Sequence, residues 1–205
     1  SILLRASWKN GRYECIQSAG KGNSDPDRVG LLWSVTLCSE RRKGLFGNHD
    51  YGGGAIRIYE DFMSNCGFYV LNDGIVFLEE FNIEIIGFDD YLLGQTEEEF
   101  YHIQSERFHL VVTHEPIISK MIDGSGENLI LSGHTHGGQI FVPYVTKRLL
   151  PNGAGQYVKG FYDMRDIGAD ACTQMYVSSG IGLTQYPFRF GNIPEIIEVS
   201  LTDIP

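Results

Sequence analysis

The stretch ENLILSGHTHGG, residues 127–138, joins an apolar run to a glycine-rich loop that carries two histidines. An apolar run of this kind, followed by glycines, predicts a buried β-strand that ends in a loop. The stretch FHLVVTHEP, residues 108–116, has the same form, because its apolar run reaches His114 and is stopped by Pro116. The sequence therefore predicts two buried strands, each with histidine at its end.

Helical and strand patterns alternate over the rest of the chain after residue 45. Apolar residues at helical spacing predict a helix over residues 56–66 that ends at Gly67. The residues Asn-Asp-Gly at 72–74 predict a hairpin turn, and Thr96 with Glu99 predicts a capped helix to about residue 104. We also expect a short helix over 117–121 and strands in GQIFVPYV (138–145), GQYVKGFYDM (155–164), TQMYVSSGIG (173–182) and PEIIEVSL (194–201). This order predicts an α/β fold built as a layered sandwich.

Four of the six histidines fall in three clusters, GNHD at residues 47–50, THEP at 113–116 and GHTH at 133–136. Each cluster follows a predicted strand, at the edge where α/β sheets bind ligands. Neutral imidazole is the commonest metal ligand, and Asn and carboxylate oxygens complete the coordination of Mn, Fe or Zn. A His-Thr-His spacing places two imidazoles on one short loop. One loop can thus serve two adjacent metal ions.

Each cluster taken alone also has a structural interpretation. Asn, Asp and Gly favour turns, so GNHD by itself is equally a turn. A histidine after a strand, such as His114, is more often structural than a ligand, and His102 and His109 are interpreted as structural. The coincidence of three clusters at three strand ends favours a metal site over these alternatives.

The motifs GNHDYGG (47–53), THEP, LSGHTHGGQI (131–140), VSSGIG (177–182) and PFRFGNIPEI (187–196) resemble those of the calcineurin-like metallophosphoesterases. The nearest resemblance is to a bacterial subgroup of small phosphodiesterases, and it covers about residues 44–205. It implies a β-sandwich flanked by helices in four layers, αββα. It also implies two divalent metal ions, Mn, Fe, Zn or Mg, at the strand ends.

The resemblance assigns the metal ligands residue by residue. Asn48, His114 and His134 would bind one metal ion, and His136 would bind the other. Two such ions lower the pKa of a shared water molecule toward about 7 and clamp a phosphate for attack. The implied activity is hydrolysis of phosphate mono- or diesters.

The same resemblance implies three further roles. His49 would contact the phosphate and protonate the leaving oxygen, and Asp50 would orient its imidazole. Arg189 would meet a substrate phosphate, with an exposed surface arginine as the alternative. The substrate would be a phosphate-ester small molecule or a lipid head group. The protein would be cytoplasmic or peripherally membrane-associated in a bacterium.

Two motifs of the family are missing from the chain. The family has an early Asp-x-His, which supplies ligands to the metal of His136, and a Gly-Asp-x-x-Asp, whose first Asp bridges both metals. No histidine precedes His49, and the only aspartates before Asp50 are Asp25 and Asp27. We therefore expect impaired catalysis. The alternative is a non-catalytic member that binds a metal or phosphate.

Charge marks a boundary near residue 45. Residues 1–45 hold eight Lys and Arg and four Asp and Glu, whereas residues 46–205 hold eight and 22. We interpret residues 1–45 as an atypical N-terminal segment, either frame-disrupted or divergent, and residues 46–205 as the phosphoesterase domain. Within the first segment only LLWSVTL, residues 31–37, predicts a strand, and residues 18–30 predict a loop. The acidic body disfavours a nucleic-acid partner.

Composition excludes several other classes of protein. The chain has 205 residues, a net charge of −10 and 42% hydrophobic residues, which fits a single globular domain. No apolar run approaches the ~18–20 residues that span a bilayer. The four cysteines are scattered, so a disulfide framework is not expected.

Overall fold

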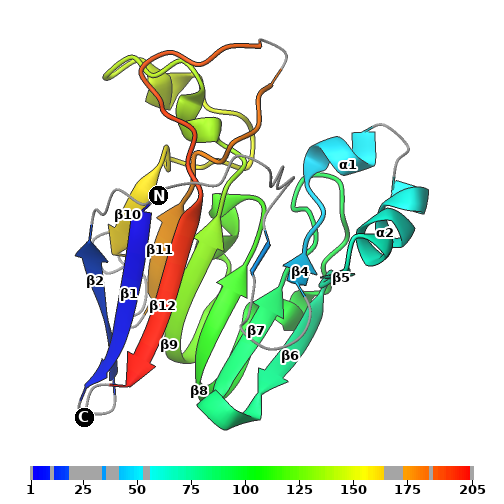
Figure 1. The fold of residues 1–205 in the computed structure, drawn as a ribbon, viewed down its shortest axis with the longest axis vertical. Coiled ribbons are helices and arrows are strands. Elements are labelled where there is room, and N and C mark those ends of the chain that lie inside the picture. The colour runs from blue at the N-terminus through cyan, green and yellow to red at the C-terminus, as the bar shows by residue number, and fades with distance from the viewer. Residues whose placement is uncertain are drawn as a thin grey trace.

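A computed structural model describes residues 2–9, 12–18, 34–35, 42–52, 56–163, 173–184 and 187–203. A six-stranded sheet with the order β10-β11-β9-β8-β7-β6 lies at its centre, and two three-stranded sheets have the orders β12-β1-β2 and β3-β4-β5 (Figure 1). The strands are β1 Ile2–Lys9, β2 Arg12–Ser18, β3 Ser34–Val35, β4 Arg42–Gly44, β5 Phe68–Val70, β6 Gly74–Leu78, β7 Ile83–Gly87, β8 His102–Val112, β9 Asp123–Ser132, β10 Gly160–Asp163, β11 Thr173–Val177 and β12 Ile197–Asp203. The helices are α1 Asn48–Gly52 and α2 Ile56–Asn65, with 3-10 helices η1 Glu79–Phe81, η2 Glu98–Tyr101, η3 Pro116–Lys120, η4 His136–Gly138 and η5 Thr146–Arg148.

The four central strands of the large sheet are parallel. β7 pairs with β8, β8 with β9, and β9 with β11 in parallel, while β6 and β10 pair antiparallel at the two edges. Every residue of β7 is buried, as expected for a strand covered on both faces. Parallel strands end at the same edge of a sheet, so the segments that follow β7, β8, β9 and β11 gather there.

One face of the large sheet packs against both small sheets. Its side chains alternate along the strands and include Ile85, Leu110 and Leu131. Leu45, which follows β4, and Val199 of β12 pack into the same cluster. The two small sheets therefore form the second layer of a β-sandwich.

α2 forms a third layer on the other side of the β3-β4-β5 sheet. Tyr59 and Met63, four residues apart on one face of the helix, pack against Phe46 and Phe68. Leu45 and Phe46 point to opposite layers because successive side chains of an extended segment alternate. Gly67, at a φ of 81°, terminates the helix as predicted.

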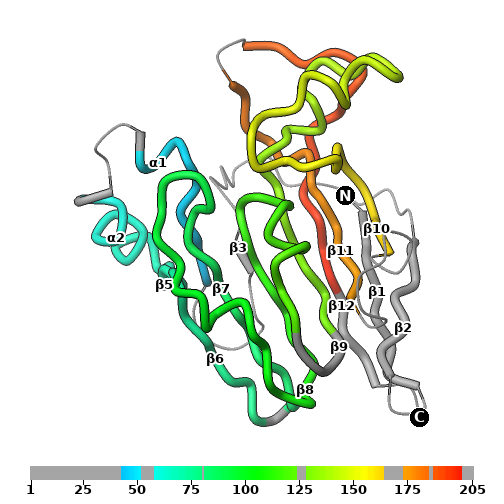
Figure 2. Tube along the Cα trace, turned by 180° about the vertical axis from the view of Figure 1, so that it is seen from behind, coloured from blue at the N-terminus to red at the C-terminus, as the bar shows by residue number. Residues whose placement is uncertain are grey.

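The remaining face of the large sheet is covered by 3-10 helices and loops rather than by α-helices. Ile118 of η3 and Tyr157 are fully buried against Val111, Ile130 and Met175. Figure 2 shows this side of the molecule. The prediction of an α/β fold with a metallophosphoesterase-like mixed sheet is confirmed. The fourth layer consists of irregular segments instead of long helices, because η3 occupies only five residues between β8 and β9.

Two local predictions between residues 68 and 104 are wrong. The Asn-Asp-Gly turn at 72–74 does not join a hairpin, since β5 pairs with β4 in one sheet and β6 with β7 in another. Thr96 does not cap a helix, because its hydroxyl donates to the Asp73 carboxylate at 2.8 Å. The chain forms the 3-10 helix η2 and then enters β8 at His102. In both cases a contact between distant segments replaces the local pattern.

The predicted strand over residues 138–145 is also wrong. This segment forms turns and leads into η5, with a single bridge between Ile140 and Phe190. Pro143 removes a backbone donor from the middle of the segment, which disfavours a ladder. The strands expected near residues 160, 173 and 197 are present as β10, β11 and β12.

The first 45 residues contain more strand than the sequence indicated. β1 pairs antiparallel with β2 and parallel with β12 from the other end of the chain. β3 lies within the predicted strand 31–37, while residues 19–30 of the predicted loop lie outside the described residues. The domain boundary near residue 45 stays a prediction. Within the described ranges, every helix is too short or too polar to cross a membrane.

Candidate metal centre

Asn48, His114 and His134 meet at the carboxyl-end edge of the large sheet. His114 follows β8 and His134 follows β9, and their rings face each other edge-to-face with centroids 5.0 Å apart. Asn48 is the first residue of α1, which follows β4 of the small β3-β4-β5 sheet, and its Oδ1 lies 3.2 Å from Nε2 of His114. The structure thus brings together the three residues expected to bind one metal ion.

A close approach of backbone to side chain fixes the His114 ring. A Cβ atom added to Gly47 would lie 2.9 Å from Cε1 of His114, so only glycine leaves room for the ring there. The GHTH loop bends sharply, with His134 at a φ of 66° and His136 at 49°. Such left-handed conformations are uncommon for residues other than glycine. Strained backbone of this kind clusters at functional sites.

The hydrogen bonds of His134 fix its tautomer. Its Nε2 lies 2.6 Å from the carbonyl oxygen of Asn152, so Nε2 carries the proton and donates. Nδ1 is then left with a free lone pair. It faces Oε1 of Glu115 at 3.8 Å. A metal ligand that donates its other N–H to a backbone carbonyl is held in the orientation needed for coordination.

Glu115 is a carboxylate that the sequence analysis did not single out. It is fully buried, and ligand atoms of His114, Glu115 and His134 all lie within 4.8 Å of one another. Its Oε2 accepts a hydrogen bond from the Tyr91 N–H at 3.0 Å. Burial, together with the neighbouring Asp90 carboxyl, raises the pKa of Glu115 to about 9. A carboxylate in this position is stabilised by a nearby cation.

Three buried polar atoms around this group make no hydrogen bond of ordinary geometry within the described part of the chain. They are Nδ1 of His114, Oε1 of Glu115 and Oδ2 of Asp90. Unsatisfied buried polar atoms are costly and need an explanation, such as an ion. Two imidazoles, a carboxylate and an amide oxygen form a donor set that suits Zn, Mn or Fe. The residues present therefore fit one divalent metal ion.

Two acidic residues near the centre also follow the end of a parallel strand, as the histidines do. Asp89 and Asp90 come directly after β7, so they reach the same sheet edge as His114 and His134. Asp89 accepts hydrogen bonds from the Tyr51 hydroxyl, at 2.5 and 2.6 Å, and from the Asn72 amide at 2.9 Å. The sequence analysis did not single out these acids; the stretch GFDDYLLG after an apolar run is their local signal, but it does not indicate which strand β7 pairs with. These bonds tie α1, which carries Tyr51, to the strand ends.

Burial keeps the histidines of the centre neutral, which is their metal-binding form. Burial, together with positive charge on His134, His136 and His49, lowers the pKa of His114 to about 3. Burial also lowers the pKa values of His134 and His136. A charge on His49 lowers all three pKa values as well.

His136 is not a member of the group formed by His114, Glu115 and His134. Its Nδ1 lies 3.3 Å from the carbonyl oxygen of Gly182. Among the described residues no hydrogen bond or ion pair joins its imidazole to a carboxylate. A single imidazole holds a divalent ion weakly, so the described side chains around His136 fit a second metal poorly.

His49 and Asp50 lie on α1 beside the centre. The His49 side chain is exposed and available to a ligand. The Asp50 carboxylate accepts a hydrogen bond from the Gly47 N–H at 2.9 Å, which holds the turn before α1. Burial raises the pKa of Asp50, while this hydrogen bond and a charge on His49 oppose the increase.

Arg189 contacts the GHTH loop through backbone oxygens. Its guanidinium donates to the carbonyl of His136 at 3.2 Å, to that of Ser179 at 2.8 Å and to that of Gly182. These bonds fasten the His136 loop to the segment after β11. The predicted contact of Arg189 with a substrate phosphate stays a prediction.

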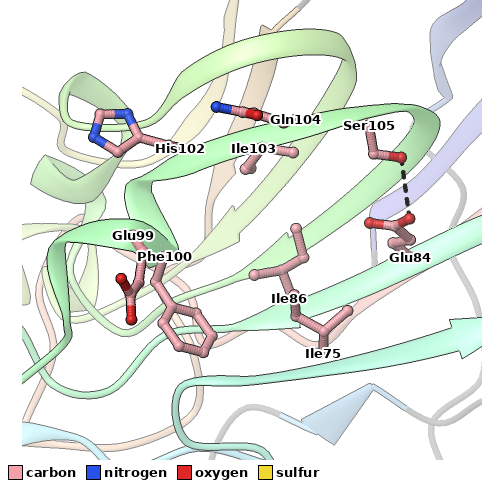
Figure 3. A pocket seen from close by; sticks show the side chains of 9 residues that line it. All are labelled: Ile75, Glu84, Ile86, Glu99, Phe100, His102, Ile103, Gln104 and Ser105. Carbon is pink, nitrogen blue, oxygen red and sulfur yellow. Dashed lines mark hydrogen bonds between the residues drawn. The ribbon is translucent and has the colours of Figure 1, made fainter.

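A cavity of about 380 Å³ lies elsewhere on the large sheet (Figure 3). It is lined by Ile75, Glu84, Ile86, Glu99, Phe100, His102, Ile103, Gln104 and Ser105. His102 and Ser105 lie at the start of β8, whereas His114 follows its end, so the whole strand separates the two. This cavity is not part of the metal centre.

Comparison with known proteins gives several relatives. The chain is 34% identical over 162 residues to an uncharacterised metallophosphoesterase, YkuE, of Bacillus subtilis (strain 168). The match covers 77% of this chain and 54% of that protein. The chain is 31% identical over 163 residues to a second, YkoQ, of the same organism, covering 74% and 57%. It is 28% identical over 160 residues to the phosphodiesterase YaeI of Escherichia coli (strain K12), covering 76% and 56%.

The chain thus spans little more than half the length of these relatives. No family model matches the chain, and no solved structure matches it.

Proposed function

Because the chain belongs to the metallophosphoesterase family, we propose that it hydrolyses phosphate mono- or diesters with a divalent metal ion held at the centre described above. The observation that carries this proposal is the meeting of Asn48, His114 and His134 at the strand ends, with a buried carboxylate beside them. Relatives named as a metallophosphoesterase and as a phosphodiesterase support the class of substrate.

His114 and His134 would hold the metal through ring nitrogens, and Asn48 would add its amide oxygen. When bound, the ion supplies a Lewis acid that polarises the phosphoryl oxygen and lowers the pKa of a coordinated water molecule. Both imidazoles are neutral and almost fully buried, so they are ready to coordinate without first losing a proton. Burial also excludes competing water, which strengthens the electrostatic interactions at the centre.

His49 would act on the other side of the phosphate. It is exposed at the rim of the centre, where it can donate a proton to the leaving oxygen. Asp50 would steady the turn that carries His49, since it bonds to the backbone of Gly47. We propose His49 as the general acid and Asp50 as a positioning residue.

A non-catalytic member of the family is the second candidate. The observation that favours it is the setting of His136, which among the described residues bonds to no carboxylate, in a chain without Asp-x-His and Gly-Asp-x-x-Asp motifs. In that case the centre binds one metal ion or a phosphate and hydrolyses nothing. We propose that a second metal ion at His136 is held weakly at best.

Hydrolysis of an aryl phosphodiester with added Mn²⁺ tests the two candidates. Wild type, His49→Ala and His134→Ala are compared, with His102→Ala as the control for loss of a histidine far from the centre. Hydrolysis that a chelator stops, and that falls at least ten-fold in both centre variants, supports the enzyme. Hydrolysis that neither variant reduces means that the site assignment is wrong. Binding of one metal per chain without hydrolysis supports the second candidate.

A further inference from the structure

A lobe of exposed apolar side chains rises beside the metal centre. We define the apical lobe as residues 139–150, 181–184 and 187–193; it projects beyond the strand ends of the large sheet in Figures 1 and 2. Of the 20 large apolar side chains that are exposed in the described part of the chain, ten belong to this lobe. Tyr144 is 94% exposed, Ile193 82%, Leu149 77% and Phe190 66%. Apolar residues gathered in this way mark an interaction surface.

Hydrogen bonds between its segments hold the apical lobe together. Two backbone hydrogen bonds join the segment 139–150 to the segment 187–193. The Phe141 N–H donates to the Phe190 carbonyl at 2.7 Å, and the Phe190 N–H donates to the Gln139 carbonyl at 3.1 Å. The Gln139 side chain bonds to the backbone of both Phe188 and Thr184. These bonds hold the exposed side chains on one framework, so no large rearrangement is needed to present them.

The turn at the tip is shaped to present Tyr144. This residue has a φ of 64°, a left-handed conformation that is uncommon for an aromatic residue. Thr146 closes the turn, because its hydroxyl accepts from the Val142 N–H at 2.8 Å. The strained backbone thus serves to point an almost fully exposed aromatic ring outward instead of into the core. Tyrosine is enriched at membrane interfaces, where its ring is apolar and its hydroxyl stays wet.

Charge distinguishes the lobe from the rest of the protein. The lobe contains none of the 22 Asp and Glu of residues 46–205. It contains three of the eight Lys and Arg of that part, namely Lys147, Arg148 and Arg189. Lys147 and Arg148 are exposed in η5, between Tyr144 and Leu149. Cations interleaved with apolar side chains are typical of surfaces that seat on anionic lipid.

The lobe also contacts His136, two residues beyond His134 of the metal centre. Arg189 and Asn192 both donate to the carbonyl oxygen of His136, and Gly182 lies against the His136 ring. A surface in contact with the lobe therefore lies close to the loop that carries His134 and His136. We propose that the apical lobe docks the protein on an anionic lipid surface, so that phosphate esters of that surface reach the centre. The substrate half of this inference rests on the proposed function.

Co-sedimentation with vesicles tests the docking directly. The full chain is mixed with vesicles of phosphatidylcholine alone or with added phosphatidylglycerol, at low and moderate salt. We expect binding to the anionic vesicles that weakens as salt rises. Each basic residue near such a surface strengthens binding about five-fold. Lys147→Glu with Arg148→Glu should therefore weaken binding at least 25-fold, and Tyr144→Ser with Leu149→Ser at least ten-fold.

The control removes apolar side chains of similar exposure from other parts of the surface. Ile58→Ser on α2 and Phe81→Ser in η1 are 66% and 59% exposed in the wild type, and should leave vesicle binding unchanged. Melting curves establish that all variants fold. Equal vesicle binding by wild type and both lobe variants overturns the proposal. The proposal is also overturned if the wild type does not bind vesicles but dimerises through the lobe in sedimentation equilibrium. In that case a second copy of the chain occupies the surface.

Hydrolysis of the soluble aryl diester separates this inference from the proposed function. The lobe variants should keep that hydrolysis while losing vesicle binding, because none of the substituted residues belongs to the centre. Vesicle binding without any hydrolysis supports the docking surface and contradicts the proposed function alone. Hydrolysis without vesicle binding contradicts the docking surface alone.

Discussion

The Nε2 atom of His114 lies 3.2 Å from Oδ1 of Asn48, across 66 positions of sequence and between two different sheets. His114 follows β8 of the large sheet, and Asn48 follows β4 of a small one. The contact forms because the two sheets pack with these strand ends at one edge. Leu45, three residues before Asn48, lies in the same apolar cluster as Val112, two residues before His114. The geometry of the centre is therefore a property of the whole sandwich.

Metal binding should stabilise the folded chain. A ligand that binds only the folded state adds about 2.7 kcal/mol at 100 times its Kd, which corresponds to about 5–10 °C in Tm for a chain of this length. We expect Zn²⁺ or Mn²⁺ to raise the Tm by this amount and a chelator to reverse the increase. His134→Ala should abolish the increase in a thermal melt, and His102→Ala should keep it. An undiminished increase in His134→Ala would show that the ion binds elsewhere.

Glu115 should contribute to metal affinity. The change Glu115→Gln keeps the side-chain shape and an oxygen acceptor for the Tyr91 N–H, but removes the charge beside His134. Loss of such a group weakens metal binding by about 10–100-fold. The Kd for Zn²⁺ is measured by competition with a chromophoric chelator, with the exposed Glu60→Gln as the control. Equal Kd values for wild type and Glu115→Gln would exclude Glu115 from the centre.

The strand ends were predictable because each prediction needed only local information. The apolar runs before His114 and His134 predict buried strands, and a histidine after such a strand lies at a sheet edge. The ends of β8 and β9 lie at one edge of the sheet because the two strands pair in parallel. An alternating α/β pattern in the sequence predicts such parallel pairing. The resemblance to a family added Asn48, whose position no periodicity predicts.

Asp90 could not be assigned in the same way. Its place beside Glu115 depends on which strand lies next to β8, and β7 takes that place only through long-range packing. The failed capping box has a similar origin. Thr96 and Glu99 have the right spacing for a helix start, yet the Asp73 carboxylate, 23 positions away, takes the threonine hydroxyl. Local propensity is a weak prior that tertiary contacts override.

Gly47 should be intolerant of a side chain. A Cβ at this position would lie 2.9 Å from Cε1 of His114, so Gly47→Ala must displace the ring. Overpacking of this kind costs about 1–3 kcal/mol, and the shift should also weaken metal binding at least ten-fold. Gly182→Ala is the matched control. Its Cβ would lie 3.3 Å from the His136 ring, which is a milder contact with a histidine outside the group that holds the ion. Unfolding and metal titrations together check this. Unchanged affinity in Gly47→Ala would mean that the His114 ring does not hold the ion.

His109 should make folding stability depend on pH. It is a fully buried residue of β8, and its Nδ1 lies 2.8 Å from Oδ1 of Asn128 on β9. Burial lowers its pKa, while the Asn128 side chain and the nearby Glu84 carboxylate partly oppose the decrease. The unfolded chain takes up a proton below pH about 6.5, before the folded chain does. Stability is thus full above that pH and is lost as pH falls toward the lowered pKa, by at most about 1.4 kcal/mol per pH unit.

His102 should act in the opposite direction and serves as the control. Its Nδ1 lies 2.6 Å from Oδ1 of Asp123, and this bond raises its pKa. The folded chain therefore holds this proton more tightly, so His102 stabilises at acid pH and that stability is lost as pH rises through the raised pKa. Urea unfolding between pH 5 and pH 8 should show a flatter acid slope in His109→Gln and a steeper one in His102→Gln. Identical slopes in wild type and His109→Gln would mean that His109 takes up its proton equally well in the folded chain.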